Sequence, residues 1–205
     1  MLISFLRIDP EVPLLEVNNT PLEKVQTNKV LGVTFCDNLK WNGNTQEIIS
    51  KAFKRLYLIR ILKRAGVPPP HLVIIYNALV RSVLEYACPV WSNSLQQYLN
   101  QKIEMVQKRA MRIIYPYTSY DMALSLSSIP CLEERKLSIC SRTFTNACDP
   151  TSRLFSNVPL HRNKVHGHNL RHTDHVSLPL CRTTTTTTTI LFCQIKYKKL
   201  HCKLN

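Results

Sequence analysis

A cationic, amphipathic stretch between Ser50 and Gly66 constrains this sequence more than any other feature. Its apolar residues recur at spacings of three and four, which predicts a helix with one buried stripe formed by Ile49, Ala52, Leu56 and Ile59. Six cations and no acid accompany them: Lys51, Lys54, Arg55, Arg60, Lys63 and Arg64. Asn44 and Thr45 offer capping oxygens before the helix, and Gly66 with the prolines after it predicts the end. A helix with this charge repels itself unless an anionic partner lies alongside, and we expect a nucleic-acid backbone.

The formal net charge of +14 is unevenly distributed along the 205 residues. Residues 48–115 hold eleven cations and two acids, and residues 150–205 hold nine cations and one acid. The first block is patterned like helices. The second block has no such pattern and contains a run of seven threonines, from Thr183 to Thr189. Residues 150–205 are therefore predicted to form a disordered basic tail.

The predicted fold class is α+β and mainly α. Residues 1–43 are expected to form a short antiparallel β element, with strands at 14–17 and 22–25 around a turn and a further β-branched run at 29–35. Gly32 lies inside that last run, where a glycine marks a bulge or a close approach by another backbone.

Residues 44–149 are predicted to form a helical bundle. After the cationic helix, further helices are expected at 69–87, at 95–115, after Ser119 and at 132–146. The second is apolar on most sides, with one narrow polar stripe of Asn77, Arg81 and Glu85. The third carries cations opposite its apolar face: Lys102, Lys108, Arg109 and Arg112.

The sequence offers little for catalysis. Its adjacent acid pair, Glu133-Glu134, stands at a predicted helix start, where the helix dipole favours acids, and no Asp-x-Asp motif could hold catalytic metal. No glycine-rich nucleotide loop is present. Histidines and a cysteine in the tail match no common zinc spacing and predict a disordered tract instead: His166, His168, His172, His175 and Cys181. We expect no enzymatic activity, no cofactor, no metal and no small-molecule substrate.

The compartment is constrained only loosely. Eight cysteines lack a C-x-x-C pair, and no secretory leader is recognised, so reduced thiols in the nucleus or cytoplasm are expected. The longest apolar run, Leu72 to Val80, is far shorter than the roughly 20 residues of a membrane span, so no anchor is expected.

The helix cations are the candidate nucleic-acid-binding residues. A solvated charged face is the usual explanation for such a run, but it normally interleaves acids, which are absent here. Backbone binding without sequence preference requires only positioned cations. Tyr57 and Tyr115 are candidate stacking residues, or equally members of the core.

Several segments in order carry a resemblance to one family. They are KVLGVTF at 29–35, LKW at 39–41, SKAFKRLYLIRILKRAGV from Ser50, LVRSVLEYACPVWSNSL from Leu79, IEMVQKRAMRIIYP from Ile103, LEERKLSIC from Leu132 and LPLCRT from Leu178. Together they resemble the region after the palm in reverse transcriptases of non-LTR (LINE-like) retrotransposons.

This resemblance implies a primer-grip hairpin and a thumb. Leu31, Gly32 and Val33 would meet the primer strand, and the helix cations would follow an RNA or DNA template–primer duplex by its shape. The fingers and the palm with its catalytic aspartates are not recognised, so they would have to act in trans. The chain is thus expected to be a non-catalytic remnant of an RNA-directed DNA polymerase.

Two other interpretations remain. Residues 30–65 resemble the N-terminal segment of alkylation-repair homologue 8 proteins, a family of tRNA-modifying dioxygenase-methyltransferases. The iron-binding His and carboxylate set and the glycine-rich loop that those activities need are not found. The chain is otherwise a protein-interaction segment, or an unfolded fragment, without a nucleic-acid role.

Overall fold

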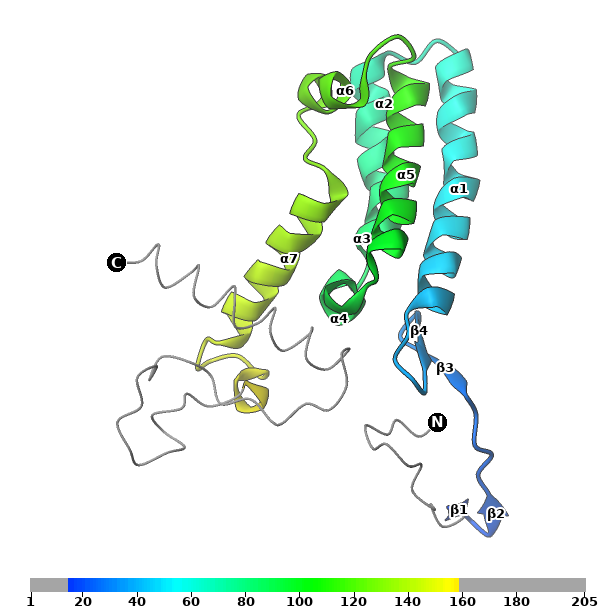
Figure 1. The fold of residues 1–205 in the computed structure, drawn as a ribbon, viewed down its shortest axis with the longest axis vertical. Coiled ribbons are helices and arrows are strands. Elements are labelled where there is room, and N and C mark those ends of the chain that lie inside the picture. Colours follow the sequence, from blue (N-terminus) through cyan, green and yellow to red (C-terminus); the bar gives the residue numbers. More distant parts are fainter. Residues whose placement is uncertain (1–14, 159–205) are drawn as a thin grey trace. The chain divides into compact units, whose positions relative to one another are not determined.

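The computed structural model describes residues 15–158. Predictions for the threonine run and the histidine-rich tract lie outside these residues. The chain divides into two compact units, residues 1–137 and 138–205. The predicted fold class is confirmed: two short antiparallel strand pairs precede a set of helices (Figure 1). The domain limits at 43/44 and 149/150 stay a prediction.

Both strand pairs are tight hairpins. The first pairs β1 (Glu16–Val17) with β2 (Thr20–Pro21), and the second pairs β3 (Thr27–Val30) with β4 (Val33–Cys36). In each, two residues with positive φ form the turn, as the right-handed twist of the strands favours.

The hairpins correct two strand predictions. The run at 29–35 is two strands, because Leu31 and Gly32 form a turn with φ of 48° and 82° where a bulge was one alternative. The expected strand at 22–25 is absent from the described part of the chain, since the first turn uses the two asparagines before Thr20 and pairing ends at Pro21.

Helix α1 (Asn42–Arg64) begins before the predicted caps. Asn44 and Thr45 lie inside its first turn and are buried, and no side chain caps its start. The Asn44 side chain instead accepts a hydrogen bond from the Thr34 backbone N–H at 3.2 Å, because β4 packs there. The predicted end is confirmed: Gly66 follows with φ of 84°.

The apolar second helix is one continuous run with a π-helical centre. It comprises α2 (Pro69–Ile75), the π-helix η1 (Tyr76–Arg81) and α3 (Ser82–Glu85). After it, Ala87 takes φ of 50° and the short helices α4 (Cys88–Trp91) and η2 (Ser92–Ser94) follow, so the run ends at Glu85, two residues before the predicted end at 87.

The predicted polar stripe of this helix is present, with Asn77 exposed, Glu85 half-buried and Arg81 buried. Arg81 is 8% exposed. Its guanidinium donates one hydrogen bond to the Glu85 carboxylate at 2.6 Å and another to the Asn77 side-chain oxygen at 3.4 Å. By length and composition alone, the run from Pro69 to Ser94 is apolar enough to cross a membrane, a property shared by core helices of soluble bundles. Tyr76, a side chain of this run, is fully buried in the first unit.

The third predicted helix is α5 (Gln97–Ile114), which runs parallel to α1 (Figure 1). Two hydrogen bonds align α1 and α5 along their axes. The Tyr98 hydroxyl donates to Asn42 near the starts of the two helices, and Lys63 Nζ donates to the Ile114 carbonyl near their ends. The core of the first unit lies between α1, α5 and the apolar helix. Its fully buried side chains include Ala52, Leu56, Ile59, Leu72, Val80, Leu84, Trp91, Ile103, Val106, Ala110 and Ile114.

The two remaining predicted helices are also present. Helix α6 (Tyr120–Ser127) is capped by the Ser119 side chain, and α7 (Leu132–Ala147) has Glu133 and Glu134 in its first turn. The second unit contains the part of α7 from residue 138 onward and the short helix η3 (Phe155–Asn157).

A buried amide holds the first unit together at the side of α5 facing α6. Gln107 is fully buried, accepts the Tyr76 hydroxyl at 2.7 Å, and donates to the Tyr120 hydroxyl at 3.1 Å and to the Pro130 carbonyl at 3.2 Å. Buried polar groups that lose a partner carry the full cost of desolvation.

Replacement of this amide tests its role in stability. Gln107→Leu should lower the free energy of unfolding by about 2–4 kcal/mol, because it leaves the Tyr76 hydroxyl and the Pro130 carbonyl without their partner. Urea denaturation of the full chain measures the difference. The exposed Gln101→Leu is the matched control, and a loss below about 0.5 kcal/mol in the Gln107 variant would contradict this role.

Candidate nucleic-acid interface

Helices α1 and α5 carry ten cations and two acids between them. The acids, Glu47 and Glu104, are both occupied elsewhere. Glu47 accepts from Lys29 at 2.7 Å and from the Thr34 hydroxyl at 2.7 Å, on the side of the β3–β4 hairpin. Glu104 accepts from the Tyr120 hydroxyl and from the Leu132 N–H, on the side of α6 and α7. The remaining charged side chains of the two helices are therefore all cations, and exposed apolar side chains such as Leu58, Ile61 and Met105 lie on the same helices.

Six of the predicted binding residues lie on the solvent side of the paired helices. We call this surface the α1–α5 face, and its cations are Lys54, Arg60, Arg64, Lys102, Arg109 and Arg112. Helical spacing places Arg60 and Arg64 on the flank of α1 that faces α5, beside Phe53. The Arg109 guanidinium lies 5.4 Å from the centre of the Phe53 ring, so the two helices meet along this seam. The parallel packing thus combines cations from two separate segments.

Lys51 and Arg55 lie on the other flank of α1. Together with Gly32 and Val33 they line a hollow of about 360 Å³ between the hairpin turn, α1 and α3. Arg55 is held there because its guanidinium donates to the Leu79 carbonyl of the π-helix at 2.5 Å. Lys51 and Arg55 therefore lie next to the hairpin turn, on a different side of α1 from the α1–α5 face.

The three primer-grip-like residues differ in exposure. Leu31 is 87% exposed at the turn, whereas the Val33 side chain is only 5% exposed and packs inward. The Tyr86 hydroxyl donates to the Leu31 carbonyl at 2.8 Å, and its ring lies 3.5 Å from where a Cβ on Gly32 would stand. The turn therefore offers only Leu31 and the Gly32 backbone to a partner.

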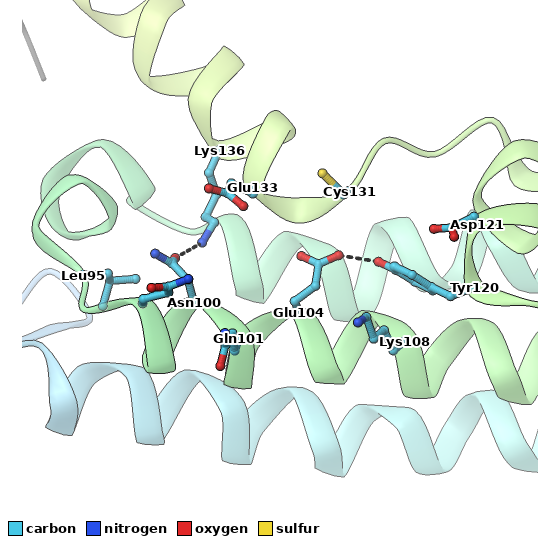
Figure 2. A pocket seen from close by; sticks show the side chains of 11 residues that line it. Leu95, Asn100, Gln101, Glu104, Lys108, Tyr120, Asp121, Cys131, Glu133 and Lys136 are labelled. Carbon is cyan, nitrogen blue, oxygen red and sulfur yellow. Dashed lines mark hydrogen bonds between the residues drawn. The ribbon is translucent and has the colours of Figure 1, made fainter. Parts of the chain in front are cut away.

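Lys63 and Lys108 belong to neither surface. Lys63 is half-buried and bonds the Ile114 carbonyl, which ties the ends of α1 and α5 together. Lys108 lies 5.2 Å from the centre of the Tyr120 ring, in a second hollow of about 570 Å³ between α5, α6 and the start of α7 (Figure 2).

The second hollow is polar, and two pairs of its side chains are hydrogen-bonded to each other (Figure 2). Lys136 Nζ donates to Asn100 at 2.7 Å, and Glu104 accepts from Tyr120. Burial, and then the hydrogen bond to Glu104, raise the pKa of Tyr120, and burial raises the pKa of the Cys131 thiol. Both groups stay protonated at neutral pH, so neither is an activated nucleophile.

In the described part of the chain, no group of three or more His, Cys, Asp or Glu side chains could hold a metal ion. The histidines and Cys181 that raised a zinc hypothesis lie outside the described residues.

The sequence did not reveal the ring–cation contacts of the α1–α5 face. Lys102 lies 5.4 Å from the centre of the Tyr98 ring, and Arg109 covers Phe53. The first pair is four residues apart on one helix, a spacing that brings side chains together, so it could have been found from the sequence. The second joins two helices and depends on their packing. Of the two stacking candidates, Tyr57 is exposed and Tyr115 is half-buried.

One family comparison gives a match. A model of the family described as alkylated DNA repair protein alkB homolog 8, N-terminal, matches residues 41–82, about a fifth of the chain. The matched segment runs from the residue before α1 through α2 and η1 to the first residue of α3, and it contains all six cations of α1. Neither the curated proteins nor the solved structures yield a match. The similarity to the alkylation-repair homologue 8 segment is thereby supported for this stretch.

The network at Glu47 joins the hairpin to α1 and depends on pH. Hydrogen bonds from Lys29 and Thr34 hold the pKa of Glu47 below its ordinary value of 4.5, and the nearby Lys51 ammonium at 3.7 Å acts in the same direction. The pKa of Glu47 is lower in the folded chain than in the unfolded chain. The network therefore stabilises the fold above pH 4.5, and this contribution is lost as the pH falls through the pKa that Glu47 has in the folded chain.

The lowered pKa of Glu47 gives a prediction for acid unfolding. Glu47→Gln should flatten the fall in stability between about pH 5 and pH 3. Lys29→Met should flatten it less, because the Thr34 and Lys51 contacts to Glu47 remain, and the double variant should flatten it no further than Glu47→Gln alone. Urea denaturation at several pH values measures the slope. Lys40→Met, at an exposed site outside the network, should keep the original slope; equal slopes in all four proteins would contradict the assignment.

Proposed function

We propose that this chain is a non-catalytic nucleic-acid-binding module that holds backbone phosphates on its α1–α5 face. The observation that carries the proposal is the charge of that face: six cations from two helices, with both acids of those helices bonded on other sides. Phosphate contacts without base contacts need only such an array, and they give binding that is independent of sequence and sensitive to salt.

Two similarities support a nucleic-acid role. The family that matches residues 41–82 is named for the repair of alkylated DNA, and the match includes the cations of α1. The resemblance to the primer grip and thumb of a non-LTR retrotransposon reverse transcriptase covers the hairpin and α5 as well. We propose on this second ground that the chain is a remnant of an RNA-directed DNA polymerase, whose palm and fingers would act in trans.

A protein-interaction role is the second candidate, and exposed apolar side chains favour it. Leu15, Val17 and Leu22 are each more than half exposed around the first hairpin, and Leu31 is exposed at the second. Apolar side chains gathered on short strands are typical of surfaces that another protein covers. An N-terminal segment of the alkylation-repair homologue 8 kind is compatible with either role.

Salt dependence separates the two candidates. Binding of the full chain to a 20-base-pair DNA duplex, followed by fluorescence anisotropy, should weaken with a log–log slope near −5 if the six cations of the face each neutralise one phosphate, at about 0.9 per contact. Arg60→Gln/Arg64→Gln should reduce the slope by about 2.

The control removes the same charge elsewhere. Lys24→Gln/Lys40→Gln lowers the net charge equally, but these exposed lysines precede α1 and lie outside the face. This variant should change the slope by less than about 1. Equal effects of the two double variants would show that only net charge matters, and no binding by the unmodified chain at low salt would overturn the proposal.

A further inference from the structure

Three aromatic rings of α1 and α5 are exposed among the cations of the two helices. Phe53, Tyr57 and Tyr98 are 38%, 60% and 44% exposed. Arg109 lies 5.4 Å from the centre of the Phe53 ring, and Lys102 lies 5.4 Å from the centre of the Tyr98 ring. Each of these two rings therefore has a cation over one face, and the part of the ring that stays exposed lies beside a positive charge.

The rings are spaced along a line. Phe53 and Tyr57 are four residues apart on α1, which places them on one face about 6 Å apart along the axis. The Tyr98 hydroxyl donates to Asn42 at 2.8 Å, so its ring lies at the first turn of α1. Because α1 and α5 run parallel, the three rings span about 22 Å of the seam.

Exposed rings of this kind suit a single strand better than a duplex. In a duplex the flat faces of the bases are stacked on one another, so an aromatic side chain beside the helix finds only sugar and phosphate. In a single strand the base faces are accessible, and stacking on an aromatic side chain adds to phosphate contacts without sequence preference. An aromatic ring beside a cation can therefore bind a base and a phosphate of the same strand.

We infer that the α1–α5 face binds single-stranded nucleic acid, with bases stacked on Phe53 and Tyr57 and phosphates on the flanking arginines and lysines. The inference rests on the proposed function and narrows its ligand from a nucleic-acid backbone to an unpaired strand. A protein partner is disfavoured at this face because the ligand must complement six cations with no acid among them.

The test compares strands and rings in the full chain. Anisotropy is measured with fluorescein-labelled 20-mers of deoxythymidine and of uridine, and with a 20-base-pair duplex, at one salt concentration. The unmodified chain should bind either single strand at least about tenfold more tightly than the duplex. Phe53→Leu/Tyr57→Leu should weaken binding to single strands about tenfold or more and change binding to the duplex by less than about twofold.

Two further variants make the result specific. Tyr57→Trp keeps a stacking ring and should bind single strands as tightly as the unmodified chain. Tyr117→Leu removes a ring that is 99% exposed beyond the end of α5, and it should leave all affinities unchanged. Circular dichroism verifies that each variant is folded, as the exposure of the replaced rings predicts.

The outcomes separate the inference from the function on which it rests. Duplex binding equal to or tighter than single-strand binding overturns the inference and leaves the proposed function standing, as does a leucine double variant that loses affinity for both forms equally. Absence of binding to every oligonucleotide overturns both. A difference between the deoxythymidine and uridine strands would identify DNA or RNA as the preferred single strand.

Discussion

The parallel packing of α1 against α5 is the interaction on which the rest of the first unit depends. Small and branched side chains close this interface, with Ala52 and Ala110 both fully buried. Hydrogen bonds from Tyr98 to Asn42 and from Lys63 to the Ile114 carbonyl align the two helices along their axes at both ends. Because burial of the apolar stripes determines which sides of the helices face solvent, it also determines where their charges lie.

The charged side chains on each side of α1 and α5 are then oriented by the elements that pack there. Glu47, whose side chain is 39% exposed, is bonded to the hairpin, and Glu104 is bonded to Tyr120 and to the start of α7. Arg55 is drawn to the Leu79 carbonyl of the π-helix, and Lys108 lies against Tyr120. Cations and aromatic rings remain exposed on the α1–α5 pair, together with aliphatic side chains such as Ile61 and Met105. Its charge is thus a result of packing on the other sides of the same helices.

The sequence predicted the helices well because their apolar spacing is regular, and it predicted the end of α1 from Gly66. It predicted the strands less well, since pairs of two to four residues depend on turn conformation more than on side-chain alternation. The binding residues were predicted as one set, but the structure distributes them over the α1–α5 face and two hollows, with Lys63 bonded to the Ile114 carbonyl. Periodicity gives the direction of a cation around its own helix and says nothing of the neighbour that it meets, so neither the Arg55–Leu79 bond nor the Arg109–Phe53 contact could be foreseen.

Lysine footprinting tests the central claim, that one face of the α1–α5 pair contacts nucleic acid. Reductive methylation of the full chain, with and without a saturating 20-nucleotide single strand, is read out by mass spectrometry of the peptides. Lys54 and Lys102, which come from different helices but share the face, should be protected together, while Lys40 and Lys108 should react as in the free protein. Protection of Lys108 with Lys54 and Lys102 unchanged would contradict the account.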